Sequence, residues 1–178
     1  MEQYRKSPRA RFLDYESGEY FITICTKKWK HYLGEINDKE MKLSEIGKYV
    51  DKQLSDSTNL CKYATILLYV VMPNHIHFVV LIPENNIRGS VEERTPTCQR
   101  HVPTTPSNQR RIPTLSKYVA SLKGAVTKYA KSIGVEFEWQ SRFHDHLIRG
   151  SRDRNNISNY ILNNVTKWQQ DCFYNSDK

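Results

Sequence analysis

Several features that would assign a sequence to a familiar class are missing from this chain of 178 residues. It has no apolar run near the roughly 20 residues that a transmembrane helix needs, so no membrane span is expected. The first residues, Met1 to Lys6, lack the apolar stretch of a secretory signal, and we expect a cytoplasmic protein. The four cysteines include no Cys-x-x-Cys pair, which argues against a structural zinc site and favours reduced thiols.

Positive charge is in excess and is concentrated in one part of the sequence. The net charge is +8, and a composition of 38% hydrophobic and 26% charged residues is typical of a soluble globular protein. The segment from Arg110 to Arg154 contains ten lysines and arginines but only four acidic residues. Such a basic block favours a phosphate backbone as partner, although a solvated surface with a chance excess of charge is the alternative. The side chains expected to contact DNA are Lys123, Arg142, Arg149, Arg152 and Lys167.

The spacing of the apolar residues predicts a mixed α and β chain that folds as a single domain over residues 1–178. Ser44 and Asp153 are the expected caps of two helices, and Gly134 is the expected end of another. The predicted elements are strands at 19–26 and 31–36, paired with each other, a helix at 41–54, strands at 63–72 and 75–82, a helix from 114, strands at 136–139 and 144–149, and a last helix ending near 170.

This order of elements predicts the α+β class: a ferredoxin-like split β-α-β sandwich with an antiparallel sheet and an extra C-terminal helix. The sheet face that the first two helices leave uncovered is expected to be free for a ligand. Residues 83–113 break the pattern, because they hold five of the seven prolines and show almost no periodic apolar signal. We expect a flexible Pro/Thr-rich insertion there.

Two histidines flank one apolar residue in the stretch His75-Ile76-His77. Because a strand turns successive side chains to opposite faces, the two imidazoles share one face while Ile76 points into the core. Paired imidazoles can hold a divalent metal ion, although two half-exposed histidines on a strand are the alternative.

A second reactive group lies on the predicted last helix. Its packing stripe is formed by Ile157, Ile161, Val165 and Trp168. Tyr160, Asn164 and Lys167 form another stripe, about 80° around the helix. Tyr160 therefore lies at the edge of the buried face, although a boundary tyrosine with its hydroxyl in water is the alternative. A phenol beside a metal ion is a nucleophile next to an electrophile activator, so the combination predicts phosphoryl transfer through tyrosine.

These motifs resemble those of the single-tyrosine HUH transposases (IS200-like transposases), in particular the REP-associated tyrosine transposases of bacteria. HUH denotes histidine, bulky apolar residue, histidine, here His75-Ile76-His77. The resemblance rests on four blocks in order, which are 20–29 (YFITICTKKW), 69–82 (YVVMPNHIHFVVLI), 139–149 (WQSRFHDHLIR) and 160–171 (YILNNVTKWQQD). One departure is Val165, which follows Asn164 where the REP-associated branch usually has proline, and which suits a continuous helix better.

The resemblance implies a DNA transposase or endonuclease that cleaves and rejoins single-stranded DNA near hairpins, usually as a homodimer. Tyr160 matches the nucleophile that forms a 5′-phosphotyrosine intermediate, and His75, His77 and Asn164 match the ligands of Mg²⁺ or Mn²⁺. Lys167 is a candidate for helping to remove the phenol proton, since an unperturbed phenol has a pKa near 10. The chain has no P-loop, which fits a reaction that stores bond energy in the covalent link and needs no nucleotide.

Three other functions fit part of this sequence. A domesticated protein that binds structured DNA without transposing it shares every motif, although intact His75, His77 and Tyr160 argue against loss of cleavage. An RNA-binding sheet domain of the RRM type lacks its aromatic motif here. A replication initiator or relaxase shares the histidine motif, but the short chain and single candidate tyrosine disfavour it. For the second His-x-His, His144-Asp145-His146, we expect a structural or DNA-contacting role.

Overall fold

The structure, a computed structural model, describes residues 17–56, 64–83 and 114–174. The strands are β1 (Gly18–Cys25), β2 (Gly34–Asn37), β3 (Glu40–Leu43), β4 (Thr65–Val71), β5 (His75–Ile82) and β6 (His144–Leu147). The helices are α1 (Glu45–Ser55), α2 (Thr114–Ser132) and α3 (Gly150–Asn163), with short 3-10 turns η1 (Lys27–Trp29) and η4 (Trp168–Gln170). The insertion predicted at 83–113 lies, apart from Pro83, outside the described residues.

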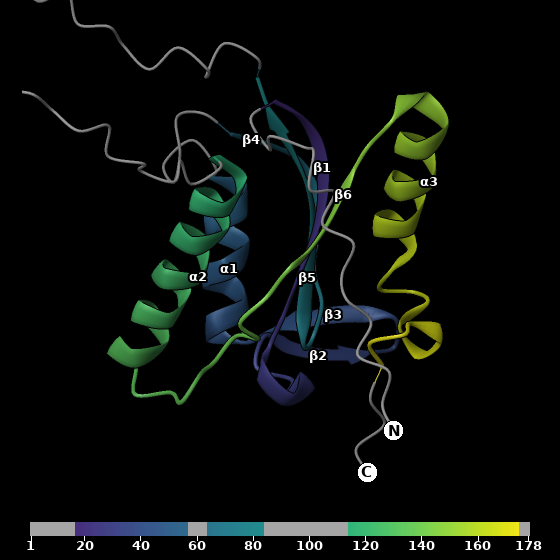
Figure 1. Cartoon of the computed structure of the whole chain (residues 1–178). Coiled ribbons are helices and arrows are strands. Elements are labelled where there is room, and N and C mark those ends of the chain that lie inside the picture. Colours follow the sequence, from purple (N-terminus) through teal and green to yellow (C-terminus); the bar gives the residue numbers. More distant parts are fainter. Residues whose placement is uncertain (1–16, 57–63, 84–113, 175–178) are drawn as a thin grey trace, which may run out of the picture.

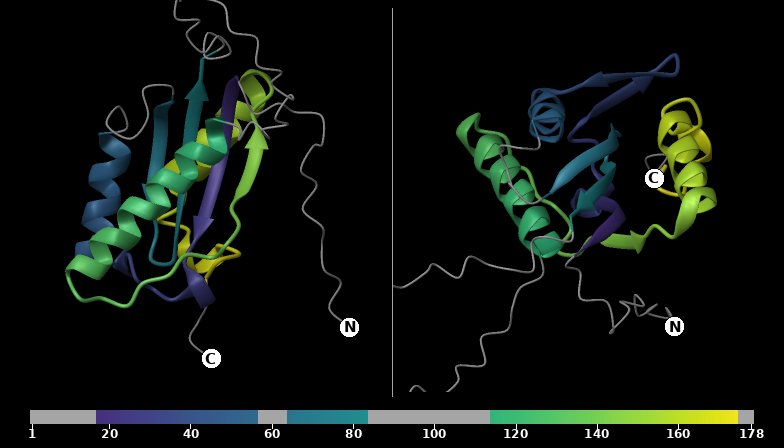
Figure 2. Two further views of the ribbon diagram at one scale, coloured as in Figure 1. Left: turned by 60° about the vertical axis from the view of Figure 1, so that its left-hand side comes forward. Right: turned by 90° about the horizontal axis from the view of Figure 1, so that it is seen from above.

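The central sheet has the strand order β4-β5-β1-β6, and every neighbouring pair is antiparallel. This is the split β-α-β arrangement of a ferredoxin-like sheet, so the predicted fold class is confirmed. Helices α1 and α2 cover one face of the sheet, and α3 lies over the other (Figure 1). The view from above in Figure 2 shows the sheet between the two layers of helices. The face expected to be free is thus partly covered by α3.

Alternation along the central strands divides their side chains between the two faces. On β5, Ile76, Phe78 and Val80 belong to the main core with α1 and α2, whereas Val79 packs in a smaller cluster with Ile157 of α3. The same alternation turns both histidines toward α3. Within the described parts of the chain, none of the helices has the length and hydropathy of a membrane span.

The region between β1 and α1 differs from its prediction. The strand expected at 31–36 is β2, which pairs with β3 in a separate two-stranded sheet and not with β1. Its turn uses Asp38 and Lys39, both at positive φ, which is typical of a tight hairpin. Met41 therefore lies in a strand, and α1 begins only after Ser44, whose hydroxyl accepts the amide of Gly47. Residues 41–43 lie within the helical spacing of apolar residues that predicted the helix, but their apolar residues also alternate as they do in a strand. The spacing therefore did not distinguish the hairpin from a first helical turn.

The predictions for the C-terminal third of the chain also differ from the structure. The strand predicted at 136–139 is reduced to a single bridge between Trp139 and Thr26. The last helix begins at Gly150, with Arg149 at its N-cap, and it ends at Asn163. Asp153 is not the cap residue, although its carboxylate accepts the Arg149 amide at 3.0 Å. The helix stops early because two asparagines and then two β-branched residues, all weak helix formers, follow Leu162.

Gly47 of α1 lies where the helix passes very close to the chain before β2. A Cβ at this position would collide with the carbonyl oxygen of Leu33, which already accepts the Ser44 amide. We therefore expect Gly47→Ala to destabilise the protein by about 2 kcal/mol, even though alanine favours helices. In thermal denaturation this corresponds to a fall in Tm of about 4–8 °C.

Gly124→Ala is the matched control, because a Cβ there would meet nothing within 4 Å. This substitution in α2 is expected to raise stability by up to about 1 kcal/mol. Equal Tm changes for the two variants would contradict the close approach of α1 to Leu33.

Candidate functional site

The histidine pair lies at the start of β5, directly after the turn Pro73-Asn74. Thr26 anchors this turn, since its amide and its hydroxyl both donate to the carbonyl of Asn74, at 2.8 and 3.0 Å. His75 and His77 have exposed fractions of 0% and 1%. Their rings are 4.4 Å apart, so the strand presents two buried imidazoles side by side.

Asn74 determines which nitrogen of His75 carries the proton. Its amide nitrogen donates to the carbonyl of Phe173 at 2.9 Å, which directs Oδ1 toward His75. That oxygen lies 2.8 Å from Nδ1 of His75 and can only accept, so Nδ1 carries the proton. The lone pair is then on Nε2, which is buried and has no hydrogen-bond partner among the described residues.

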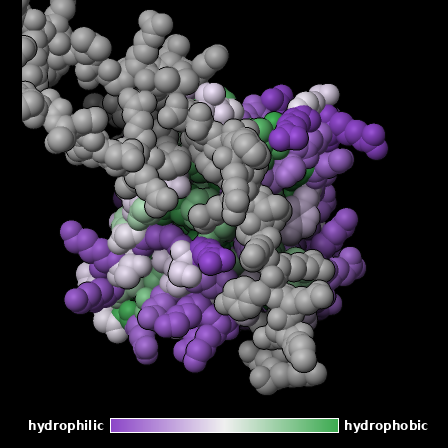
Figure 3. Space-filling model, in the orientation of Figure 1, coloured by the Kyte–Doolittle hydropathy of each residue, from purple (hydrophilic) through white to green (hydrophobic). Residues whose placement is uncertain are grey.

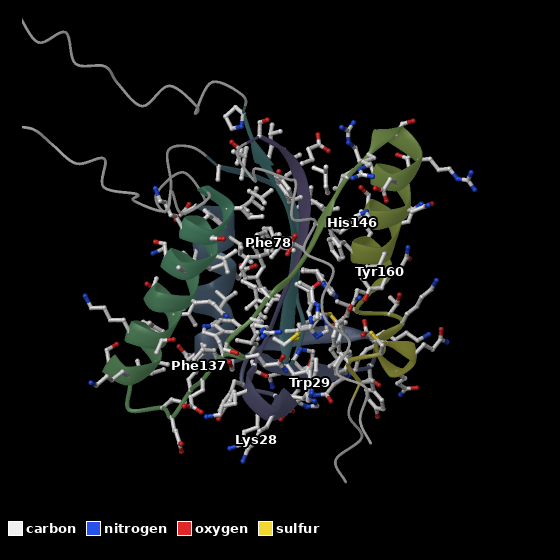
Figure 4. All side chains as sticks on the ribbon, viewed as in Figure 1. Lys28, Trp29, Phe78, Phe137, His146 and Tyr160 are labelled. Carbon is white, nitrogen blue, oxygen red and sulfur yellow. The ribbon has the colours of Figure 1, made fainter. Side chains whose placement is uncertain are left out.

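His77 connects the sheet to the tyrosine of α3. Its Nδ1 lies 2.8 Å from the hydroxyl of Thr23 on the neighbouring strand, and its Nε2 lies 3.2 Å from the Tyr160 hydroxyl. Figure 4 shows Tyr160 on the side of α3 that faces the sheet. The phenol is 40% exposed, so it reaches solvent from the edge of a buried cluster.

Asp171 is the carboxylate of this cluster. Its Oδ2 accepts the Tyr160 hydroxyl at 3.1 Å and the Asn164 amide at 2.9 Å, and its Oδ1 accepts the amide of Phe173 at 2.8 Å. Since the carbonyl of Phe173 accepts from Asn74, one continuous path of hydrogen bonds links Asp171 to His75. The segment after α3 is thereby fixed against the histidine strand.

Aromatic side chains enclose the two imidazoles. Phe173 and Trp168 lie against His75, with ring centroids 4.7 and 5.9 Å away. Phe21 stacks on His77 at 5.2 Å. These rings exclude water from both histidines and hold them in a low-dielectric environment.

The enclosure changes the protonation of the site. Burial lowers the pKa of His75 to about 3, and burial together with the neighbouring His75 lowers the pKa of His77 well below its usual value. Both imidazoles are therefore neutral at pH 7 and available as ligands. Burial, followed by the charge and hydrogen bond of Asp171, raises the pKa of Tyr160. The phenol is thus firmly protonated in this arrangement.

The donor set fits a divalent metal ion. His75, His77 and Asp171 each offer one ligand atom, and these atoms lie within 4.8 Å of one another. Two buried atoms, Nε2 of His75 and Oδ1 of Asn164, have no hydrogen-bond partner in the described chain. Buried polar atoms normally have a partner, so such orphans indicate a missing ligand. Imidazole and carboxylate donors suit Mn²⁺, and Mg²⁺ is compatible with the oxygen donors.

The structure brings together Tyr160, His75, His77 and Asn164, the residues that the sequence singled out. It adds Asp171, to which the sequence assigned no role. In a helix continuing to residue 170, Asp171 would lie about 16 Å along the axis from Tyr160. The early end of α3 turns the chain back and returns the carboxylate to the phenol. The signal for this was the run of weak helix formers after Leu162.

The basic residues expected to contact DNA are spread over the molecule. Lys123 lies on α2, on the opposite side of the sheet, and its ammonium donates to the carbonyl of Gln140 at 2.7 Å. Arg142, Arg149 and Arg152 are exposed before and at the start of α3. Lys167 lies beside Tyr160 in a surface pocket. Their contacts with DNA remain predictions.

The second His-x-His lies on the edge strand β6. Its register with β1 places both imidazoles on the same sheet face as His77. His146 pairs with Asp153 at the first turn of α3, with 2.9 Å between Nε2 and Oδ2. Within the described residues, neither His144 nor His146 belongs to the group of metal-ligand candidates.

Asn74 offers a test of how the ligands are held. Asn74→Ala removes both side-chain bonds, whereas Asn74→Asp keeps the acceptor for His75 and loses the donor to Phe173. Because partners of metal ligands typically contribute 10–100-fold to affinity, we expect Asn74→Ala to weaken Mn²⁺ binding by about that factor. Asn74→Asp should retain more affinity than Asn74→Ala. Calorimetric titration with Mn²⁺ measures both.

If Asn74 had a purely structural role, replacing it would leave the tautomer of the His75 imidazole unchanged. In ¹⁵N NMR, we expect His75 to show a protonated Nδ1 in the wild type and in Asn74→Asp, and a mixture of tautomers in Asn74→Ala. Identical His75 spectra in all three proteins would contradict the assignment.

Comparisons with known proteins find a relative by sequence and solved structures of similar fold. No family model matches the sequence. An uncharacterized protein of Haemophilus influenzae is 31% identical over 173 residues, covering 96% of this chain and 93% of that protein. The structure of a REP-associated tyrosine transposase bound to a REP hairpin matches with a TM-score of 0.56 and 18% identity, over 94% of this chain and 74% of that one. A candidate transposase of Deinococcus radiodurans R1 aligns at a TM-score of only 0.45, with 17% identity over 92% and 97% of the chains.

The fold is therefore that of the tyrosine transposases, and the resemblance predicted from the four sequence blocks is confirmed at this level. The chain belongs to the same family as the Haemophilus influenzae protein.

Proposed function

We propose that this protein is a metal-dependent DNA strand transferase that cleaves single-stranded DNA near hairpins through a covalent bond to Tyr160. The observation that carries this proposal is the position of the Tyr160 hydroxyl, 3.2 Å from His77 and 3.1 Å from Asp171. A structural tyrosine would not need a buried neutral imidazole and a carboxylate at its hydroxyl. The fold shared with a REP-associated tyrosine transposase supports the same function.

His75, His77 and Asp171 would hold the ion, with Oδ1 of Asn164 as a further donor. A bound Mn²⁺ or Mg²⁺ would supply Lewis-acid polarisation of the scissile phosphate. The metal ligands predicted from the sequence were His75, His77 and Asn164. The proposal adds the carboxylate of Asp171 to them.

The residues of the chain account for the covalent step. Asp171 accepts the phenol proton along the hydrogen bond that already joins the two side chains. The Tyr160 oxygen then forms a bond to phosphorus, the bond from phosphorus to the 3′-oxygen breaks, and the 3′-oxygen leaves as a hydroxyl after taking a proton from solvent. The result is a 5′-phosphotyrosine link. Asp171 takes the role first suggested for Lys167, which has no hydrogen bond to Tyr160 in the structure.

The proposed partner is single-stranded DNA that carries a hairpin. The solved transposase of the same fold is bound to a REP hairpin. A net charge of +8 favours a phosphate backbone. We further propose that the protein acts in the cytoplasm as a homodimer.

Incubation with Mn²⁺ and end-labelled, hairpin-bearing single-stranded DNA tests this function. We expect a protein–DNA adduct that survives a denaturing gel and is lost when EDTA is added first. Digestion and mass spectrometry should place the nucleotide on Tyr160. If the DNA binds on a native gel but never forms an adduct, the protein is instead a DNA-binding module. This is the domesticated DNA-binding protein that the sequence left as an alternative.

A further inference from the structure

A surface pocket of about 340 Å³ opens beside the Tyr160 hydroxyl. Its wall is mostly made of amide side chains, which are Asn156, Asn159, Asn163, Asn164 and Gln170. Lys167 is its one cationic residue, and Asp171 lies where the pocket meets the metal-ligand cluster. Figure 3 shows that the surface at the right of the molecule, over α3, is largely hydrophilic.

The position of the pocket determines what can occupy it. His75 and His77 are almost completely buried, whereas Tyr160 is 40% exposed and forms part of the pocket wall. A phosphate that approaches the exposed phenol from the pocket side therefore lies next to this wall. The nucleotide attached to that phosphate is then held within reach of the amides.

The amides have unused hydrogen-bonding capacity. The side chains of Asn156, Asn159 and Gln170 form no hydrogen bond within the described chain, and Asn163 uses only its Nδ2, on the carbonyl of Asn159. An amide has a donor and an acceptor side by side but no charge. This pair suits the edge of a nucleobase better than a phosphate, and adenine is the base that asparagine and glutamine bind through two parallel hydrogen bonds.

We propose that this pocket binds the unpaired base next to the scissile phosphate, with adenine preferred, and that Asn159 and Asn156 read its edge. Lys167 contacts the adjoining phosphate. The inference rests on the proposed function, because it assigns part of the DNA specificity to that same site.

Selection of DNA by binding tests the inference without requiring cleavage. A pool of hairpin oligonucleotides with a randomised single-stranded flank is incubated with the protein in EDTA, and the retained DNA is sequenced. We expect enrichment of adenine at one flank position by about tenfold over the other bases, the discrimination of one good base contact. The enrichment should fall to within about twofold in Asn159→Ala and decrease in Asn156→Ala.

Asn155→Ala is the matched control, since Asn155 is an exposed asparagine on the same helix that does not line the pocket. It should retain the wild-type enrichment. Three results would overturn the pocket assignment. They are a retained pool whose flank is random, enrichment of a base other than adenine, and a preference that is unchanged in Asn159→Ala. Failure to retain any DNA would instead overturn the proposed function, and adduct formation with Mn²⁺ tests that function separately.

Discussion

Tyr160→Phe is expected to abolish the covalent protein–DNA adduct, with a rate at least about a thousandfold below that of the wild type. The substitution removes one oxygen, which is the atom proposed to attack phosphorus. The hydroxyl lies beside the imidazole of His77 and the carboxylate of Asp171, and the proposal assigns both of these groups to holding the metal ion. Adduct formation with Mn²⁺ and labelled hairpin DNA, followed over time on denaturing gels, measures the effect.

The same variant should remain folded and bind DNA. The lost hydroxyl contributes one or two hydrogen bonds at a partly exposed position, so its removal should cost no more than about 1–2 kcal/mol of stability. Tyr174→Phe is the matched control, since Tyr174 is 39% exposed, also lies near the end of the described chain and packs on Trp168. Its adduct rate should equal that of the wild type. An adduct in Tyr160→Phe at the wild-type rate would show that another group is the nucleophile.

The sheet and the histidine pair were predictable from the sequence because both depend on a local period of two. Along β5 the apolar residues and the histidines alternate, and this alone places His75 and His77 on one face and Ile76 on the other. The two-residue turn Pro73-Asn74 then fixes the pairing with β4. No long-range information was needed for this part of the site.

The remaining parts depend on contacts between distant segments. Whether residues 40–43 form a strand or the first turn of a helix depends on pairing with β2, which periodicity alone does not determine. The position of Asp171, the third candidate ligand, depends on where α3 ends. Asp171 reaches Tyr160 only because the chain reverses after Asn164 and is held by Asn74, a residue 97 positions earlier.

Asp171→Asn is expected to weaken Mn²⁺ binding by at least about 10–100-fold, because that is the usual effect of losing even a hydrogen-bonding partner of a metal ligand. The substitution keeps the size of the side chain and leaves an oxygen that can accept hydrogen bonds. It removes the one negative charge in a cluster whose other members are neutral imidazoles. An uncharged amide oxygen attracts a dication less strongly than a carboxylate. Calorimetric titration of Mn²⁺ into the purified protein measures the change.

A second measurement separates the charge of Asp171 from its packing. Since Asp171 contributes to the raised pKa of Tyr160, Asp171→Asn should lower that pKa, which ultraviolet titration of the phenolate can detect against Tyr160→Phe. A variant that had merely disturbed the fold would expose the phenol and would also change the NMR signals of the enclosed His75 and His77 imidazoles.

The comparison with Asn164→Ala decides which residue completes the metal site. The sequence resemblance assigns that role to Asn164, whose Oδ1 is buried and has no partner among the described residues. The structure places Asp171 in the cluster and uses the Asn164 amide to hold its carboxylate at 2.9 Å. We therefore expect Asn164→Ala to weaken Mn²⁺ binding less than Asp171→Asn. The reverse order would make Asn164 the principal third ligand and reduce Asp171 to the acceptor of the Tyr160 proton.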